Sequence, residues 1–313
     1  MEDFVARQDL IDRDRLRALS QKSDRPGLIR IAIHLGMLCV TGAAVLSVRD
    51  TFWVLPAMVV HGIVLAYLFC PLHEATHGTA FRTRWLNDRV GDLCGFLTVY
   101  PRLMYRSFHF AHHRYTQDPE RDPELGLRKP TRISEYLVWI SGWYYWTGKF
   151  GTLFRWAFTG KAEAHFVHKR DEAGLVREAR LVLGGYAMIA VIGILTDPVI
   201  PLVLWAIPAI LGQPFLRGYL ITEHTGCAGG PNMLENVRTV MAGPVVRWLA
   251  WNMPYHTEHH TFPSIPFHAL PAAHQEIRDH LVHVAPSHAA FNARLLRGFL
   301  RSGAAAPSDA SAS

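Results

Sequence analysis

The chain has 313 residues, half of them hydrophobic, and a formal net charge of +6 at neutral pH. Its length permits one large domain or two small ones. Acids are interleaved with the basic residues, as in Asp118-Pro119-Glu120-Arg121-Asp122, whereas nucleic-acid-binding proteins concentrate basic charge on one face or tail. We therefore expect no nucleic-acid partner. The four cysteines show no paired spacing, which argues against a disulfide framework or a thiolate metal site.

Residues 1–27 are rich in Arg, Asp and Gln and are expected to form a cytoplasmic helix in front of the membrane. They lack the basic start and short apolar core of a cleavable signal peptide. The turn-forming sequence Asp24-Arg25-Pro26-Gly27 closes this segment.

Four apolar segments predict membrane-spanning helices, because a helix needs about 20 apolar residues to cross a bilayer. The links within each pair are very short, Arg49-Asp50-Thr51 in the first and Asp197 alone in the second, so the spans should form two hairpins. The alternative, four buried helices of a soluble protein, is disfavoured because soluble helices keep a polar face. The predicted spans cover about residues 28–48, 52–72, 179–196 and 198–221.

The remaining long segments carry most of the Arg and Lys residues, and the positive-inside rule places them in the cytoplasm together with both termini. In a bacterium this would be the inner membrane. We expect an all-α membrane protein in which residues 28–285 form two hairpins with a cytoplasmic helical cap. Residues 286–313 are expected to be a partly disordered C-terminal tail, with small residues from Ser302 onward.

Three further helical segments are expected in the cap. Val90 to Tyr105 is too short and interrupted to cross and should lie at the interface. Residues 133–158 are dense in Trp, Tyr and Phe, which favour the headgroup level, so we prefer an interfacial segment to a fifth span. Leu234 to Met253 is predicted to be a helix.

Three clusters of histidines have the spacing that returns side chains to one helical face, since residues three and four apart are neighbours there. One such cluster among 18 histidines would not be surprising, but three would be. Neutral imidazole binds zinc, copper, iron and nickel, so we interpret the clusters as metal ligands. The candidate ligands are His73 and His77, then His109, His112 and His113, then His256, His259 and His260.

His224 is a ninth candidate ligand, because it emerges from the fourth span on the same side of the membrane as His73 and His77. Glu223 is a weaker candidate. Eight or nine ligands are too many for one metal and suit two, although the residues alone do not choose iron. The carboxylates of the loop from Arg114 to Pro123 either orient the histidines or are simply solvated.

The other histidines lack this clustered pattern. Those in the charged segment, His165 and His168, should be solvated, and those near the C-terminus should be surface residues: His268, His274, His280, His283 and His288.

The order of the three clusters on two hairpins resembles the integral-membrane fatty acid desaturase and hydroxylase family, over roughly residues 30–285. Each cluster is a histidine box in the terms used for that family, and three such boxes in this order are a very specific signal. The flanking residues are also similar to those of bacterial members, namely Tyr115, Asp118-Pro119, Asn252-Met253-Pro254-Tyr255 and Phe262-Pro263.

The resemblance implies two iron ions held by the eight box histidines and His224, dioxygen as the oxidant, and removal of hydrogen from an unactivated C–H bond of a membrane lipid or acyl substrate. Some animal acyl-CoA desaturases have an asparagine four residues before the extra histidine, where this chain has Leu220, so the outer coordination of the second iron stays open. An external ferredoxin or cytochrome is implied as electron donor, because the short tails lack the His-Pro-Gly-Gly motif of a fused cytochrome b5.

Three functions are compatible with these observations. The favoured one is a lipid or acyl-chain desaturase. The second is a hydroxylase or oxygenase on the same scaffold, or a desaturase of a small non-lipid metabolite. The third, a metal transporter, is disfavoured because transporters carry ligands near the bilayer midplane, where this chain has only the unpaired His34 and His61.

Overall fold

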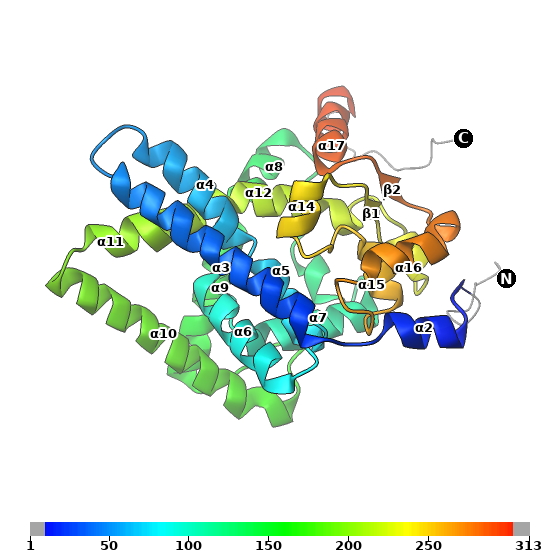
Figure 1. The fold of residues 1–313 in the computed structure, drawn as a ribbon, viewed down its shortest axis with the longest axis horizontal. Coiled ribbons are helices and arrows are strands. Elements are labelled where there is room, and N and C mark those ends of the chain that lie inside the picture. The colour runs from blue at the N-terminus through cyan, green and yellow to red at the C-terminus, as the bar shows by residue number, and fades with distance from the viewer. Residues whose placement is uncertain (1–9, 303–313) are drawn as a thin grey trace.

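The structure, a computed structural model, describes residues 10–302 and is almost entirely helical, which confirms the all-α prediction (Figure 1). Two short strands, β1 (Thr239–Val240) and β2 (Val284–Ala285), pair in parallel. The helices are α2 (Arg13–Leu19), α3 (Asp24–Ser47), α4 (Val54–Ala66), α5 (Phe69–His77), α6 (Arg84–Leu97), α7 (Arg102–Tyr115), η1 (Pro123–Gly126), α8 (Ile133–Ile140), α9 (Trp143–Thr159), η2 (Lys169–Asp171), α10 (Glu172–Leu195), α11 (Val199–Pro201), η3 (Leu202–Ala206), α12 (Ile207–His224), α13 (Met233–Asn236), α14 (Pro244–Leu249), α15 (His256–Thr261), α16 (Leu270–Ile277), η4 (Arg278–His280) and α17 (His288–Ser302).

Two helical hairpins form the elongated left-hand part of the molecule in Figure 1, as predicted. The first runs up α3 and back through α4 and α5, and the second runs along α10 and back through α11, η3 and α12. All four arms are long and apolar enough to cross a membrane. The two tips meet in an ion pair, in which Arg49 Nη1 lies 3.2 Å from Asp197 Oδ2.

The outer arm of the second hairpin exposes large apolar side chains along its length. Ile194 and Leu195 of α10 are 74% and 78% exposed, and Leu181 and Met188 are also exposed. Contiguous apolar surface of this kind is stable against lipid tails rather than against water. The chain is therefore a membrane protein.

The inner arms of the hairpins touch backbone to backbone at two glycines. A Cβ atom on Gly212 of α12 would lie 2.0 Å from the carbonyl oxygen of Gly62 in α4, and a Cβ on Gly62 would lie 2.2 Å from the carbonyl oxygen of Pro208. Small residues at such crossings let membrane helices approach closely. This contact aligns α12 with the α4–α5 arm, so both arms end at the same level with His224 and His77 as their last residues.

The helical cap lies to the right in Figure 1 and differs from the sequence prediction in two places. Val90 to Tyr105 is divided between α6 and α7, because Val99 has a positive φ of 57° and Pro101 starts the next helix. The single helix expected from Leu234 to Met253 is wrong. The buried Arg238 holds this stretch extended by donating to the carbonyls of Thr222 (2.7 Å) and Thr225 (2.8 Å).

The chain ends differ in how much of each is described. Of the predicted N-terminal helix, residues 13–19 are helical as α2, and α3 begins at Asp24. The predicted tail begins with α17, in which Asn292 donates to the carbonyl of Gly218 (2.8 Å) and accepts from the hydroxyl of Tyr136 (2.8 Å). The folded unit therefore continues past residue 285. The expectations for residues 1–9 and 303–313 lie outside the described residues.

We predict that Gly212→Ala lowers the thermal unfolding temperature of the purified protein by about 2 °C or more, because overpacking costs about 1–3 kcal/mol. Gly36→Ala is the matched control, since Gly36 lies in α3 and a Cβ added there would have no atom within 4 Å. There the gain in helix propensity should leave the temperature unchanged or raise it. Equal effects of the two substitutions would contradict the close α4–α12 contact.

Candidate metal centre

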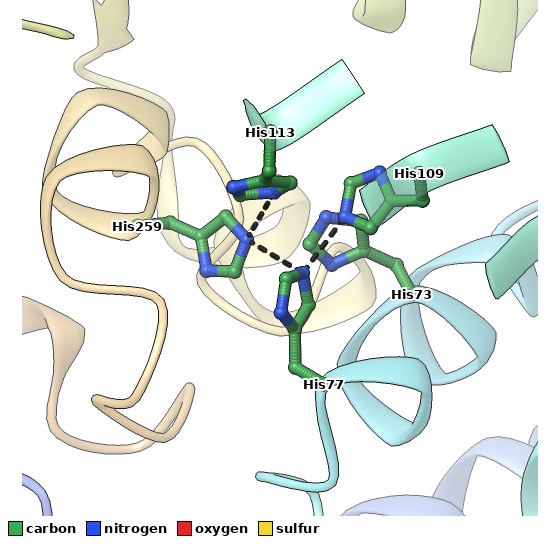
Figure 2. A group of neighbouring side chains, drawn as sticks. All are labelled: His73, His77, His109, His113 and His259. Atoms are coloured by element: carbon green, nitrogen blue, oxygen red, sulfur yellow. Dashed lines mark hydrogen bonds between the residues drawn. The ribbon is translucent and has the colours of Figure 1, made fainter. Parts of the chain in front are cut away.

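Nine histidines from four helices converge at the junction of the hairpins and the cap, and they divide into two groups. The first group contains His73 and His77 of α5, His109 and His113 of α7 and His259 of α15, with one ligand atom from each lying within 4.8 Å of all the others (Figure 2). The ring nitrogens approach closely, and Nε2 of His77 lies 2.8 Å from Nε2 of His109.

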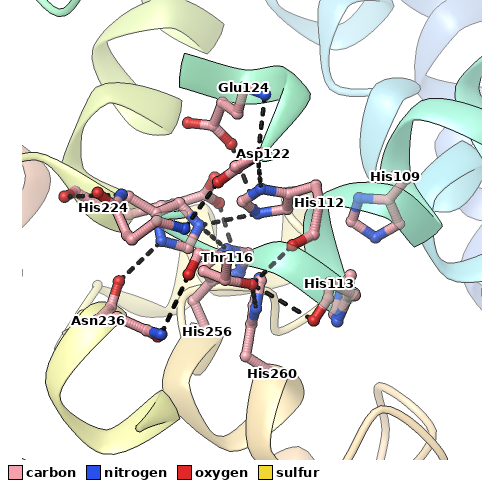
Figure 3. Close-up of polar contacts among 12 residues, drawn as sticks. His109, His112, His113, Thr116, Asp122, Glu124, His224, Asn236, His256 and His260 are labelled. Carbon is pink, nitrogen blue, oxygen red and sulfur yellow. Dashed lines mark hydrogen bonds and ion pairs between the residues drawn. The ribbon is translucent and has the colours of Figure 1, made fainter. Parts of the chain in front are cut away.

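The second group contains His112 of α7, His224 at the end of α12 and His260 of α15, again within 4.8 Å of one another (Figure 3). His256 joins this group, because its Nε2 lies 3.2 Å from Nε2 of His224. All nine histidines that the sequence singled out therefore lie in one place, although their role as ligands remains a prediction.

Helix geometry explains why there are two groups. Consecutive helical residues point about 100° apart, so His112 and His113 diverge from α7 to opposite groups, as do His259 and His260 from α15. The pair spaced by four, His109 and His113, stays together. The two groups are in contact, since the rings of His113 and His260 stack with centroids 4.0 Å apart.

In the second group, hydrogen bonds at Nδ1 fix which ring nitrogen faces inward (Figure 3). His112 Nδ1 donates to the carboxylate of Asp122 (2.9 Å), and His224 Nδ1 donates to the carbonyl of Asn236 (3.0 Å). The Thr116 hydroxyl donates to the carbonyl of His112 (2.8 Å), so it accepts from His260 Nδ1 at 3.3 Å. Each Nε2 therefore points its lone pair at the centre of the group.

The first group is less constrained by such contacts. Neither ring nitrogen of the buried His73 has a hydrogen-bond partner within residues 10–302. A buried polar atom without a partner is costly, and a metal ion would satisfy it. Burial, together with the neighbouring imidazoles, holds the pKa of His109, His113 and His259 well below its usual range, which keeps these rings in the neutral form that binds metals.

The glutamates inside the histidine boxes face away from the two groups and connect the boxes to the cap. Glu74 of the first box accepts from the backbone N–H of Phe267 (2.9 Å), just beyond the last box. Glu258 of the last box accepts from Thr239 Oγ1 (2.6 Å) and from Nδ1 of His274 (2.5 Å). His274 is therefore buried and structural, and its prediction as a surface residue was wrong.

The approach to the last box depends on an unusual backbone. Trp251 and Asn252 have φ angles of 52° and 59°, in the left-handed region that Asn tolerates better than most residues. The Asn252 side chain donates to the carbonyl of Phe267 (3.0 Å), and Arg247 donates to the hydroxyl of Tyr255 (2.9 Å). The motif Asn252-Met253-Pro254-Tyr255 is therefore explained by structure, because its first and last residues hold the backbone that leads into the last box.

The other histidines of the spans and of the charged segment lie outside both groups. His165 and His168 are exposed, as predicted. In the spans, His34 Nε2 lies 2.9 Å from the carbonyl of Val64, and His61 Nε2 lies 2.9 Å from that of Leu204, so each ring is held by a different helix carbonyl and the two do not form a midplane ligand pair. Glu223 lies at the edge of the second group, 3.7 Å from His256 Nδ1.

The carboxylates of the loop after α7 take both of the roles that the sequence left open, since one orients a histidine and another is solvated. Asp122 is buried against His112, whereas Asp118 pairs with Arg121 near the surface. Glu124, which the sequence analysis did not single out, lies 3.5 Å from Nε2 of His112 and pairs with Lys129 at 2.5 Å. Burial alone would raise the pKa of Glu124, but nearby positive charge, that of Lys129 above all, outweighs it and holds that pKa well below its usual range.

A cavity of about 220 Å³ opens beside the two groups, toward α8 and α9. Aromatic side chains form much of its wall, and the end nearest the two groups is formed by His73, His109, His112 and His256. The far end contains Lys149 and Arg217, which the sequence analysis also missed, although Arg217 stood out as a charge within an apolar span. The aromatic wall consists of Phe69, Tyr100, Tyr105, Phe108, Trp139, Tyr144 and Tyr145.

Comparison with known proteins gives an independent result. Residues 50–291 match the sequence model of the family described as fatty acid desaturase. The chain is 25% identical to a sphingolipid delta(4)-desaturase of Drosophila melanogaster, over 86% of this chain and 82% of the relative. It is 27% identical to a human sphingolipid delta(4)-desaturase/C4-monooxygenase (74% and 67%) and 26% identical to a beta-carotene ketolase of a Paracoccus strain (78% and 82%).

We predict that Asp122→Asn weakens metal binding by roughly 10- to 100-fold, because the amide presents a donor as well as an acceptor to His112 Nδ1 and no longer fixes its tautomer. The measurement is metal retained after dialysis against graded chelator. Asp118→Asn, in the same loop but paired with Arg121, should behave as wild type. Equal retention in the two variants would show that Asp122 does not orient a ligand.

Proposed function

We propose that this chain, which belongs to the fatty acid desaturase family, is a di-iron, dioxygen-dependent membrane oxidoreductase that introduces a double bond into an acyl chain or lipid. The observation that carries this proposal is the convergence of nine histidines into two touching groups. The family uses iron, and an all-imidazole donor set of this size suits a metal pair.

In this proposal, His73, His77, His109, His113 and His259 hold one iron, and His112, His224, His256 and His260 hold the other. When bound and reduced, the pair would supply electrons to dioxygen and so make it able to take hydrogen from an unactivated C–H bond. Glu124 and Glu223, at the edge of the second group, are carboxylates that could complete its surroundings where Leu220 offers none.

The protein's own contribution is to orient its ligands and to exclude water. Asp122, Asn236 and Thr116 hold three of the imidazoles with Nε2 inward. The aromatic wall of the cavity, which includes Tyr105 stacked on His109 at 4.9 Å, keeps the reacting end apolar. An acyl chain in this cavity would present its C–H bonds to both groups while bulk water is kept away.

The same scaffold supports hydroxylation as a second candidate, because one relative is named as both a desaturase and a C4-monooxygenase. Mass spectrometry of lipids and metabolites from cells with and without the protein separates the two. Desaturation predicts a product that has lost two hydrogens. A product that has gained one oxygen would reject desaturation in favour of hydroxylation, and an altered non-lipid metabolite would reject the lipid substrate.

We place the histidine groups on the cytoplasmic side, with both chain ends there, because the short hairpin tips carry few basic residues and the cap carries many. A separate protein, a ferredoxin or a cytochrome, would then bring electrons from the cytoplasm. Its docking site in this proposal is a groove of about 720 Å³ along the outer face of α7.

The groove lies beside the histidines. Arg106, Phe110 and Arg114 are spaced by four on a face of α7 adjacent to the face that carries the histidines, and all three line the groove. Phe110 is 38% exposed, and its ring lies 5.6 Å from that of His77. An electron could therefore pass from the groove to His77 through the single side chain of Phe110. The groove's basic residues suit an acidic donor protein.

We predict that replacing Arg106 and Arg114 together by Glu raises KM for a reduced plant-type ferredoxin, an acidic donor, by at least about tenfold, because reversed charges repel the donor. Iron content should not change. Arg155→Glu, on the exposed face of α9 and outside the groove, is the control. An unchanged KM in the double variant would place the donor elsewhere.

We also predict that His112→Ala costs most of the bound iron and all turnover, whereas His168→Ala, at an exposed position, keeps both. His112 contributes both an inward Nε2 and the link to Asp122. Iron is measured by elemental analysis of the purified protein. Full iron in His112→Ala would contradict the ligand assignment.

A further inference from the structure

The far end of the cavity contains two cations that face the same aromatic ring. Arg217 of α12 has its guanidinium carbon 4.7 Å from the ring centre of Tyr145, and Lys149 of α9 has its Nζ 6.0 Å from the same centre. The ammonium also lies 3.2 Å from the ring centre of Tyr100. Both side chains line the cavity that reaches the histidine groups.

These two cations differ from the third cation of the cavity in having no acidic partner. Lys129 forms an ion pair with Glu124 at 2.5 Å. Within residues 10–302, no carboxylate forms an ion pair with Lys149 or with Arg217, whose hydrogen-bond partner is the neutral Oε1 of Gln213 at 3.1 Å. Arg217 lies within a helix that can span the membrane, where an unpaired charge is expensive and marks a functional site by default.

The aromatic contacts do not by themselves account for this arrangement. A desolvated cation–π contact gives about 2 kcal/mol, whereas removing a cation from water costs several kcal/mol even after relaxation. The two like charges also repel each other. Consistent with this, burial and the charge of Arg217 hold the pKa of Lys149 well below its usual range. An anion between the two cations would relieve both costs.

The position of Arg217 on α12 relates this site to the histidine groups. Arg217, Leu220 and His224 are spaced by three and four, so they share one helix face, and Arg217 and Leu220 both line the cavity. Seven residues of helix place Arg217 about 10 Å from His224 along the axis. A chain anchored at Arg217 would pass Leu220 on its way to the histidines.

We propose that Lys149 and Arg217 bind an anionic headgroup, a carboxylate or a phosphate, and so select acidic acyl substrates over neutral ones. This inference rests on the proposed function for the fate of the substrate, but not for the binding itself. Arg is suited to the task, because its planar fork matches the oxygens of a carboxylate or phosphate in a bidentate geometry. The anchored headgroup would also determine which carbon lies beside the histidine groups.

The test is equilibrium dialysis of the full-length, detergent-purified protein with three radiolabelled probes of equal chain length: octanoate, octyl phosphate and neutral octanamide. We expect the wild type to bind one or both anions at least roughly tenfold more tightly than the amide, as charge-assisted hydrogen bonds predict. Which anion binds more tightly identifies the headgroup. Equal binding of all three probes would overturn the proposal.

Variants assign the preference to the two cations. Lys149→Met and Arg217→Gln should each reduce it, and Arg155→Gln, which removes an exposed charge from α9, should leave it intact. If Arg217→Gln fails to fold, Arg217→Lys, which keeps the charge, should retain the preference while Lys149→Met loses it. An undiminished preference in Lys149→Met would overturn the assignment.

Thermal unfolding without ligand distinguishes binding from a structural role. If the cations exist to bind an anion, Lys149→Met should leave the unfolding temperature unchanged or raise it, because an unpaired buried charge has been removed. A clear drop would indicate that the cation–π contacts are structural and would count against the proposal. A charge preference without turnover would contradict only the proposed function, and turnover on neutral lipids without a charge preference would contradict only this inference.

Discussion

The structure depends on gathering nine imidazole rings, seven of them buried, around two neighbouring points with their ring nitrogens correctly oriented. A protonated ring in such a place would be repelled by its neighbours and poorly solvated, and a neutral ring turned the wrong way would point a proton at the centre. The second group meets this constraint with three hydrogen bonds that its Nδ1 atoms donate to Asp122, Asn236 and Thr116. In the first group, His73 has no such partner among the described residues, so a metal ion would contribute more there to fixing the rings.

The fold can be understood as the means of bringing these rings together. The contact of Gly62 with Gly212 aligns the inner arms, so that α5 supplies two histidines to the first group and α12 supplies one to the second. The cap then adds α7 and α15, each of which supplies both groups. Two carboxylates inside the boxes attach them to the cap: Glu74 accepts from Phe267, and Glu258 accepts from Thr239. The boxes therefore carry structural as well as ligand residues.

Much of this could be predicted from sequence, because helical spacing and apolar length are local properties. The spans, the hairpins and the nine histidines follow from such patterns. The division into five and four does not, since it depends on how α7 and α15 cross. The burial of His274 was missed because its partner, Glu258, is distant in sequence. The helix expected after residue 234 failed for the same reason, since Arg238 is held by carbonyls of residues 222 and 225. The cations of the cavity were missed because their shared position appears only when α9 packs beside α12.

The most direct test of the central claim is iron K-edge X-ray absorption of the purified wild-type protein, combined with its iron content. The account predicts a pair of irons per chain, each in a shell of nitrogen ligands with the multiple scattering of imidazole. A single metal per chain, or a shell dominated by oxygen or sulfur, would contradict it.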